Sequence, residues 1–277
     1  MQGFERGRLA LVGCGNMGGA MLRGWRAKGL SPDRIVVQDP KLPPETQRAF
    51  AASGVSVVSD VAALDESDPP AVLIMAVKPQ VMDAVFDGVA GAIGSDTVVL
   101  SVAAGRTLAS FEARAPDATA IVRSIPNTPA AIGRGMTVCC GNAHVTPDQR
   151  SRVDAVLSAI GEVGWVDDEG LIDAATAVSG SGPAYVFHLA EALEAAAIDV
   201  GLAPDLARQL AVATVAGAGE LLNQSDEPAL QLRENVTSPN GTTAAALAHL
   251  MADGQGLKEL MKRAVIAARD RSRELSG

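Results

Sequence analysis

Residues 9–18 read LALVGCGNMG and decide the fold of the first half of the chain. A short apolar run leads into a turn whose glycines, Gly13, Gly15 and Gly18, have the spacing G-x-G-x-x-G. The first glycine permits a tight turn, the second lets the backbone approach a pyrophosphate, and the third lets a helix pack on the strand. A helix that begins here offers free N–H groups to phosphates, so Asn16 and Met17 join the glycines as expected dinucleotide contacts. The alternative is a glycine turn with a purely structural role.

Apolar runs alternate with helical periodicity through the rest of this half. Several of the runs are apolar throughout rather than alternating, which is typical of parallel strands covered on both faces. We therefore expect an α/β fold with a Rossmann-type, doubly wound sheet. The expected strands are 9–12, 35–37, 55–58, 72–77, 98–102, 121–124 and 137–139, and the expected helices are 17–28 and 45–51.

The character of the sequence changes after Trp165, and from Glu169 onward no strand is expected. Stretches rich in alanine and leucine predict helices over 184–200, 205–222, 243–252 and 256–273. We expect a dinucleotide-binding domain over 1–166 and an all-helical domain over 167–277. Because helices this apolar usually bury their surface, we expect the second domain to form a subunit interface.

The end of the second strand bears on the choice between NADH and NADPH. Gln38 and Asp39 stand there, and the Asp39 carboxylate can accept a hydrogen bond from a ribose 2′-hydroxyl, which favours NADH. Arg34 and Lys41 are close in sequence and are the alternative partners of a 2′-phosphate. Asp39 can equally be a simple turn residue before Pro40, and the sequence leaves these alternatives open.

Two further groups of residues follow expected strands. Ala76, Val77, Lys78 and Pro79 lie at the carboxyl end of one strand, where an open α/β sheet binds its coenzyme; the alternative is a solvated lysine before a helix. Asn127 lies in the turn Pro126–Pro129, where two prolines hold its amide ready for a nicotinamide or a substrate. The alternative there is turn chemistry alone.

Two loops rich in glycine and hydroxyl groups precede helices in the second half, at 179–183 and 235–243. Backbone N–H groups in such loops bind anions, although a single loop of this kind can be only a helix cap. Two of them beside a coenzyme domain indicate a small carboxylate substrate.

Tyr185 has no lysine four residues on, so the Tyr/Lys proton-donor pair of one carbonyl-reductase class is missing. An imine substrate eases this problem, because its nitrogen can arrive already protonated.

Composition restricts the partners and the location. The net charge of −9 argues against nucleic acid or an anionic membrane as the main partner. No apolar run approaches the ~20 residues of a membrane helix, and no secretory signal is recognised. The three cysteines, Cys14, Cys139 and Cys140, show no metal-ligand spacing, so we expect no metal site and a reducing cytoplasm.

Taken together, these motifs resemble the Δ1-pyrroline-5-carboxylate reductase family over essentially the whole chain. The resemblance rests on 13–18, 77–79, 126–129, 179–185 and, most specifically, 236–243. It implies reduction of L-Δ1-pyrroline-5-carboxylate to L-proline, the last step of proline biosynthesis, with NADPH or NADH as hydride donor. It also implies a Rossmann domain followed by a helical domain that forms an intertwined homodimer, often within a ring of dimers.

By position, the resemblance implies that the glycine turn, Lys78 and Pro79 hold the coenzyme, with Asn127 near the nicotinamide. It implies that the substrate carboxylate is framed by the loop residues Ser238, Asn240, Gly241 and Thr242. Thr243 matches the hydroxyl near the ring nitrogen and is the expected hydrogen-bond partner or proton donor. Asp226 matches an acidic position of some members.

The chain departs from the family at two places. Many members have Ser, Asn or Arg where this chain has Gln38 and Asp39, and often Gly in place of Asn240. The alternatives to the family activity are a reductase of a different cyclic imine carboxylate, a β-hydroxyacid dehydrogenase, and a non-catalytic sensor that binds a dinucleotide.

Overall fold

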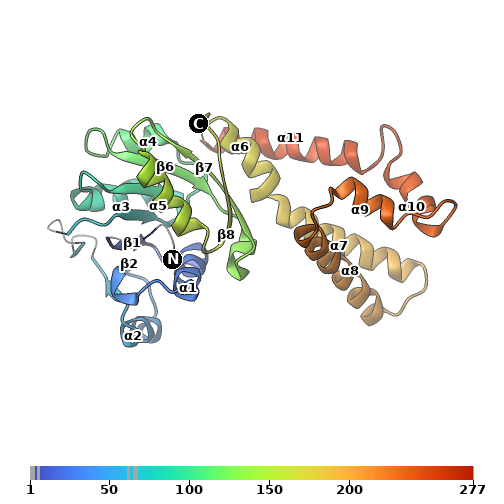
Figure 1. Cartoon of the computed structure of the whole chain (residues 1–277), viewed down its shortest axis with the longest axis horizontal. Coiled ribbons are helices and arrows are strands. Elements are labelled where there is room, and N and C mark those ends of the chain that lie inside the picture. Colours follow the sequence, from blue (N-terminus) through green and yellow to red (C-terminus); the bar gives the residue numbers. More distant parts are fainter. Residues whose placement is uncertain (1–3, 5–6, 61–62, 65–67, 277) are drawn as a thin grey trace. The chain divides into compact units, whose positions relative to one another are not determined.

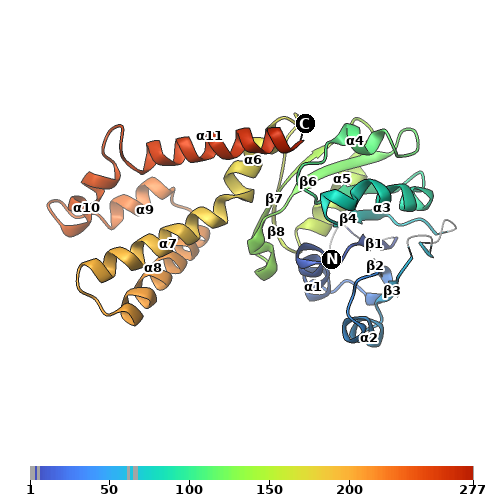
Figure 2. The same ribbon diagram turned by 180° about the vertical axis from the view of Figure 1, so that it is seen from behind.

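A computed structural model describes Phe4 and residues 7–60, 63–64 and 68–276 of the chain. The chain divides into two compact units (Figures 1 and 2). Unit 1 comprises residues 1–180 and 269–277, and unit 2 comprises residues 181–268.

Unit 1 is built on one sheet of eight strands in the order β3-β2-β1-β4-β5-β6-β7-β8. The first six strands are parallel, β7 runs antiparallel to β6, and β8 is parallel to β7. The order reverses between β1 and β4, which is where doubly wound sheets bind ligands. The strands are β1 Leu9–Val12, β2 Ile35–Gln38, β3 Ser56–Val58, β4 Val72–Met75, β5 Val98–Ser101, β6 Ala120–Ile125, β7 Gly135–Gly141 and β8 Gly161–Trp165.

Helices cover both faces of this sheet, which is why its strands are apolar throughout. Along β4, Val72 and Ile74 enter the core on one face, and Leu73 and Met75 enter the core on the other. The first core is closed by α1 (Asn16–Ala27) and α5 (Pro147–Leu157). The two helices are joined by a hydrogen bond in which Trp25 Nε1–H of α1 donates to the Val156 carbonyl of α5 at 2.9 Å. The second core is closed by α3 (Met82–Val89), α4 (Leu108–Glu112) and α6 (Leu171–Ala175). The expected doubly wound α/β fold is confirmed.

All seven expected strands occur, with small shifts at their ends. Strand β8 was not expected, because two glycines and a glutamate interrupt its apolar pattern, as suits a half-buried edge strand. Helix α5 was not expected either, because its residues are mostly polar, although Thr146 and Gln149 form a capping box at its start. The expected second helix is α2 (Pro44–Ala52). Cys139 and Cys140 point to opposite faces of β7, one into each core.

Residues 171–180 pack with unit 1, although their sequence character is that of the helical half. After α6, the turn Thr176–Gly180 is π-helical. Ile172 is buried in the second core and Asp173 is buried beside β6. The compact units therefore part at 180/181, and the expected domain boundary at 166/167 stays a prediction.

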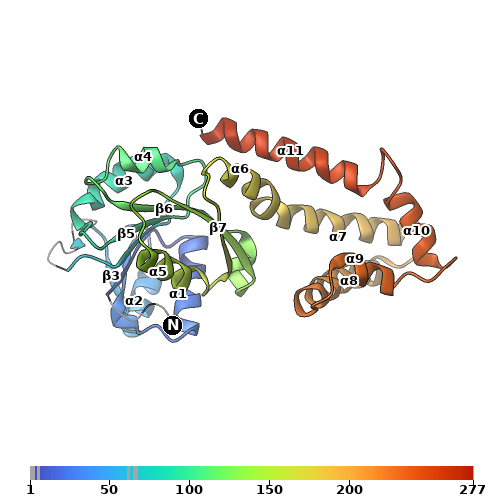
Figure 3. The same ribbon diagram turned by 45° about the horizontal axis from the view of Figure 1, so that its top comes forward.

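Unit 2 is entirely helical among the residues that the structure describes (Figure 3). Its helices are α7 Gly182–Asp199, α8 Pro204–Gln224, α9 Ala229–Asn235, α10 Thr242–Leu250 and the larger part of α11 Leu257–Ser276. Helix α9 was not expected. In the α7–α8 hairpin only small side chains, Ala207 and Ala211, are fully buried, while large apolar side chains such as Phe187 stay exposed. No helix in the described part of the chain is long and apolar enough to cross a membrane.

Candidate active site

The glycine turn after β1 has the geometry that its spacing predicts. Gly13 has φ +90°, and a Cβ there would lie 2.8 Å from the Ala76 carbonyl oxygen. A Cβ on Gly18 would overlap the carbonyl oxygen of Gly13, so the start of α1 can pack closely only with glycine. Around Gly15, by contrast, nothing lies within 4 Å of the Cβ position. Two glycines are therefore required by the fold, and the third borders open space.

That open space joins a cavity of about 450 Å³ at the carboxyl edge of the sheet. Asp39, Lys41 and Lys78 are the charged residues at its wall, and no described residue pairs with either lysine ammonium. The cavity is lined by Gly13, Gly15, Gln38, Asp39, Pro40, Lys41, Ala76, Val77, Lys78, Val81 and Val85. The structure therefore brings together most of the residues expected to bind the coenzyme. Pro79 begins the short 3₁₀ helix η3 (Pro79–Val81) beside it.

Asn16 and Met17 line a second cavity, of about 720 Å³, which runs along α1. It begins at Cys14 and Gly15 and reaches Thr128 in the turn after β6. Arg23 and Arg26 of α1 also line it. The glycine turn thus separates two hollows, one on the β2–β4 side and one along α1.

Asp39 holds the glycine turn in place. Its Oδ2 accepts the backbone N–H of Cys14, and its Oδ1 accepts the backbone N–H of Lys41, each at 2.9 Å. The pKa of the Cys14 thiol is raised to about 11, mainly because the thiol is buried and, to a smaller extent, because the Asp39 carboxylate lies near it. Gln38 contributes through its backbone, since its carbonyl accepts the Gly13 N–H at 2.8 Å while its side chain donates to the Ser59 carbonyl.

Arg34 does not reach this edge of the sheet. It precedes β2, where its guanidinium donates to the carbonyls of Phe4 and Gly7 and stacks over the Phe4 ring. The cavity of about 450 Å³ lies at the carboxyl end of the same strand. Of the two basic residues offered as alternative partners of a 2′-phosphate, Lys41 lines the cavity and Arg34 does not.

Asn127 uses its amide to join two segments of unit 1. Its Oδ1 accepts the Met136 N–H, and its Nδ2 donates to the Ser179 carbonyl, both at 2.9 Å. The expected rigid amide is present, and it fixes the π-helical turn to the loop after β6. Its contact with a nicotinamide stays a prediction.

The loop 235–243 of unit 2 leads into α10 without a side-chain cap. Asn240 has φ +58°, so it adopts the left-handed conformation for which the family often has glycine. Gly241 is the N-cap residue, and a Cβ on it would overlap the Ser238 hydroxyl. The N–H groups of the first turn, at Thr242 and Thr243, are left for a ligand or water. Asp226 is exposed in the turn between α8 and α9, and its role stays a prediction.

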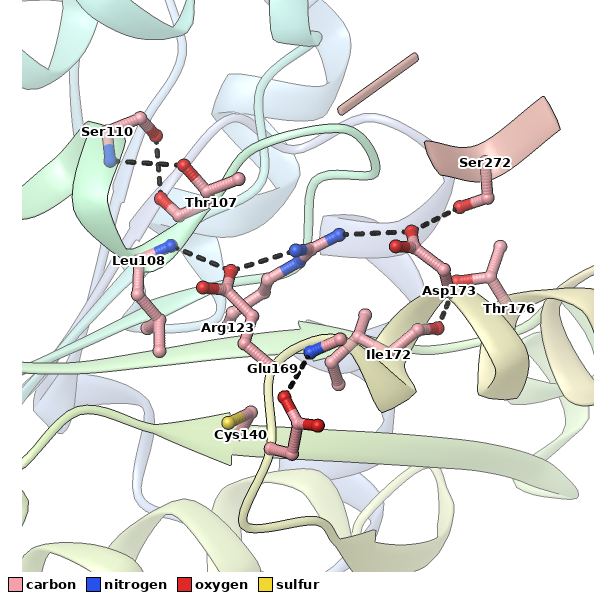
Figure 4. Close-up of polar contacts among 12 residues, drawn as sticks. Thr107, Leu108, Ser110, Arg123, Cys140, Glu169, Ile172, Asp173, Thr176 and Ser272 are labelled. Atoms are coloured by element: carbon pink, nitrogen blue, oxygen red, sulfur yellow. Dashed lines mark hydrogen bonds and ion pairs between the residues drawn. The ribbon is translucent and has the colours of Figure 1, made fainter. Parts of the chain in front are cut away.

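Unit 1 also contains a buried ion cluster that was not expected from the sequence (Figure 4). The Arg123 side chain, only 3% exposed on β6, lies 2.8 Å from Glu169 Oε1 and 3.8 Å from Asp173 Oδ1. Glu169 Oε1 also accepts the Leu108 N–H, and Asp173 Oδ1 accepts the Ser272 hydroxyl. A charged residue inside the apolar strand sequence AIVRSI was the signal that could have identified it. No group of three His, Cys, Asp or Glu side chains in the described ranges could hold a metal ion.

Comparison with known proteins covers both halves of the chain. A family model for pyrroline-5-carboxylate reductase dimerisation matches residues 169–275, and one for NADP oxidoreductases dependent on coenzyme F420 matches residues 8–105. Pyrroline-5-carboxylate reductase of Pseudomonas aeruginosa is 38% identical over 97% of this chain and 97% of its own length. That of Synechocystis is 39% identical over 97% of this chain and 98% of its own length.

Solved structures agree with these relatives. The pyrroline-5-carboxylate reductase of Coxiella burnetii superposes with a TM-score of 0.90 at 35% identity, covering 98% of this chain and 99% of that one. The Plasmodium falciparum pyrroline carboxylate reductase, solved with NADP bound, gives a TM-score of 0.80 at 27% identity, covering 99% of each chain. On the strength of identity that runs through both units, the chain belongs to the pyrroline-5-carboxylate reductase family.

Proposed function

We propose that the chain reduces L-Δ1-pyrroline-5-carboxylate to L-proline, the last step of proline biosynthesis, with NADPH or NADH as hydride donor. Bound NAD(P)H would supply a hydride to C5 of the imine, and one proton on the ring nitrogen would complete the secondary amine. The chain is an NAD(P)H-dependent oxidoreductase. The observation that carries this function is similarity to a reductase of this activity over 97% of the chain.

The coenzyme is proposed to lie across the carboxyl edge of the sheet. Gly13, Gly15, Asn16, Met17 and Gly18 would hold the pyrophosphate, because the turn is open at Gly15 and leads into a helix N-terminus. The adenosine half would fill the cavity of about 450 Å³. Its proposed contacts are Gln38, Asp39, Ala76, Val77, Lys78 and Pro79, with Asn127 toward the nicotinamide.

NADH is the proposed preferred coenzyme. The Asp39 carboxylate is fixed by two backbone N–H groups and keeps lone pairs for a ribose 2′-hydroxyl. A 2′-phosphate would bring about two negative charges to this fixed carboxylate. Lys41 and Lys78 line the same cavity and favour NADPH, but each is a mobile ammonium on a flexible chain. The proposed preference rests on the Asp39 carboxylate being held in position, whereas each lysine loses side-chain entropy when it binds.

The substrate carboxylate is proposed to bind at the N-terminus of α10. Ser238, Asn240, Gly241 and Thr242 would frame it mainly through backbone groups, supported by the uncapped first turn and its positive dipole end. The Thr243 hydroxyl is proposed as the hydrogen-bond partner or proton donor of the ring nitrogen. Because an iminium arrives with its proton, a correctly placed hydroxyl is sufficient for orientation.

A homodimer formed through the helical unit is the proposed assembly, with a ring of dimers as the larger form. Exposed apolar side chains on α7 and α8, among them Phe187, Leu193 and Leu210, support an interface there. We also propose a cytoplasmic location, supported by three free cysteines. The net charge of −9 gives no reason to propose nucleic acid as a partner.

The test is a spectrophotometric assay of the purified protein. Oxidation of NADH, and separately of NADPH, is followed with pyrroline-5-carboxylate and with its six-membered homologue. Rapid oxidation with the five-membered imine, and a higher kcat/KM with NADH, is the expected result. Faster turnover of the six-membered ring would point to a different cyclic imine reductase. Coenzyme binding without oxidation of either imine would leave a non-catalytic dinucleotide sensor.

A further inference from the structure

We propose that Arg123 is a positioning residue for hydride transfer, because it holds the two turns of unit 1 that border the nicotinamide half of the coenzyme. The inference rests on the proposed function. The adenosine half is expected beside β1, β2 and β4, so the other half of the coenzyme extends toward β5 and β6. Arg123 lies on β6, in register with Ser101, the last residue of β5.

Through Glu169, Arg123 fixes the turn after β5. Glu169 Oε1 receives the Arg123 Nη1–H at 2.8 Å and the Leu108 N–H at 2.9 Å, so one oxygen joins β6 to the start of α4. The turn of residues 102–107 ends at that helix start. Within it Gly105 has φ +73°, and a Cβ there would lie 3.2 Å from the Leu275 carbonyl of α11. The turn is therefore packed on one side and hydrogen-bonded at its end.

Through Asp173, Arg123 also fixes the segment that backs the turn after β6. Asp173 Oδ1 lies 3.8 Å from Arg123 Nη2 and accepts the Ser272 hydroxyl at 2.7 Å (Figure 4). Farther along the same segment, the Ser179 carbonyl accepts from Asn127. The segment 169–180 is thus attached to β6 and its turn at two points, Arg123 and Asn127.

Stability alone does not account for this arrangement. One guanidinium faces two carboxylates, and its Nε has no hydrogen-bond partner among the described residues. Burying such charges costs about as much as their attraction returns, and apolar replacements of similar volume are often as stable or more stable. What the cluster supplies is a unique geometry for the strands and turns that it joins. Small displacements at a reacting pair cost about 100-fold in rate, so this geometry matters for hydride transfer.

The experiment compares the wild-type enzyme with a triple variant, Arg123→Met, Glu169→Gln and Asp173→Asn, which removes all three charges together and leaves no uncompensated ion. Four quantities are measured: the melting temperature, the Kd of NADH, kcat, and the primary isotope effect with NADH deuterated at the transferred C4 position. We expect a melting temperature close to that of the wild type and a Kd within about threefold, since the glycine turn is untouched. We expect kcat to fall about 10- to 100-fold and the isotope effect to rise, because misplacement slows the chemical step.

Arg114→Met is the matched control, because Arg114 pairs with Asp87 and Asp83 on the surface of the same unit. Its kcat and isotope effect should equal those of the wild type. Arg123→Lys keeps the charge but not the two-pronged contact, and it should recover only part of the rate. An unchanged kcat and isotope effect in the triple variant, or a rate that falls only with the folded fraction, would overturn the proposal. If the wild-type enzyme were inactive on pyrroline-5-carboxylate, that result would instead contradict the proposed function itself.

Discussion

Replacing Gly15 with alanine should separate the role of this glycine in coenzyme binding from any role in folding. Gly15 has φ −72° and ψ −154°, an ordinary conformation for alanine, and no atom lies within 4 Å of the added Cβ. Alanine is a poorer N-cap than glycine by up to ~1 kcal/mol, but it lowers the entropy of the unfolded chain by ~0.4–1 kcal/mol. The two effects nearly cancel, so the stability of the coenzyme-free protein should hardly change.

Coenzyme affinity should respond quite differently. The new methyl group occupies the space through which the pyrophosphate approaches the backbone, and overpacking of one methyl costs about 1–3 kcal/mol. At ~1.4 kcal/mol for each factor of ten, the Kd of NADH should rise about 5- to 150-fold. Fluorescence titration gives the Kd, and thermal unfolding without coenzyme gives the stability.

Two other glycines provide the comparison. Gly18→Ala should lower both affinity and stability, because its Cβ overlaps the Gly13 carbonyl oxygen. Gly217→Ala, in α8 of unit 2 with open space around it, should change neither the NADH affinity nor the glycine turn. A folded Gly15→Ala variant that binds NADH as tightly as the wild type would refute the assignment of this turn to the pyrophosphate.

Three further results are expected. Asp39→Ser should move the ratio of kcat/KM for NADPH over NADH upward by at least about tenfold, equivalent to ~1.4 kcal/mol, and an unmoved ratio would remove Asp39 from coenzyme choice. Thr243→Ala should lower kcat about 10- to 100-fold with an unchanged melting temperature, which is at the low end of general acid effects because a hydroxyl is a weak acid. Thr243→Ser should recover most of the rate, and full activity in the alanine variant would contradict the role of Thr243 at the ring nitrogen. The folded chain keeps the Cys14 proton to a pKa of about 11 while the unfolded thiol loses it near 9.0, so the free energy of unfolding should fall as pH rises through this interval. Cys14→Ser should make that fall shallower in denaturant titrations, and identical slopes would show that Cys14 is not the titrating group.

Local chemistry explains what could be predicted from the sequence. The glycine turn and the apolar strands each depend on residues close in sequence, so spacing and residue type were sufficient. Strand β8 and helix α5 could not be predicted in this way. The edge position of β8 tolerates glycines. The first six residues of α5 are proline or polar, and its apolar core residues are gathered near its end.

Long-range contacts account for the parts of the site that were not foreseen. Arg34 and Lys41 flank the same strand in sequence, and that extended strand puts them at its opposite ends. Arg123, Glu169, Asp173 and Ser272 meet only after β6, α6 and α11 have packed, and no sequence spacing links them. The sign in the sequence was the positive charge of Arg123 within a strand that is otherwise largely apolar.

The apolar surface left on the helical unit would make the stability of the fold depend on the protein concentration. Phe187, Leu193 and Leu210 are exposed in one chain. A second chain that covered them, as proposed above, would bind the folded state only. Each tenfold rise in protein concentration then adds about 1.4 kcal/mol to the stability of the assembled form. Dilution lowers this stability. In a cell that makes little of this enzyme, each molecule would therefore be unfolded for a larger fraction of the time and would be cleaved by proteases more often.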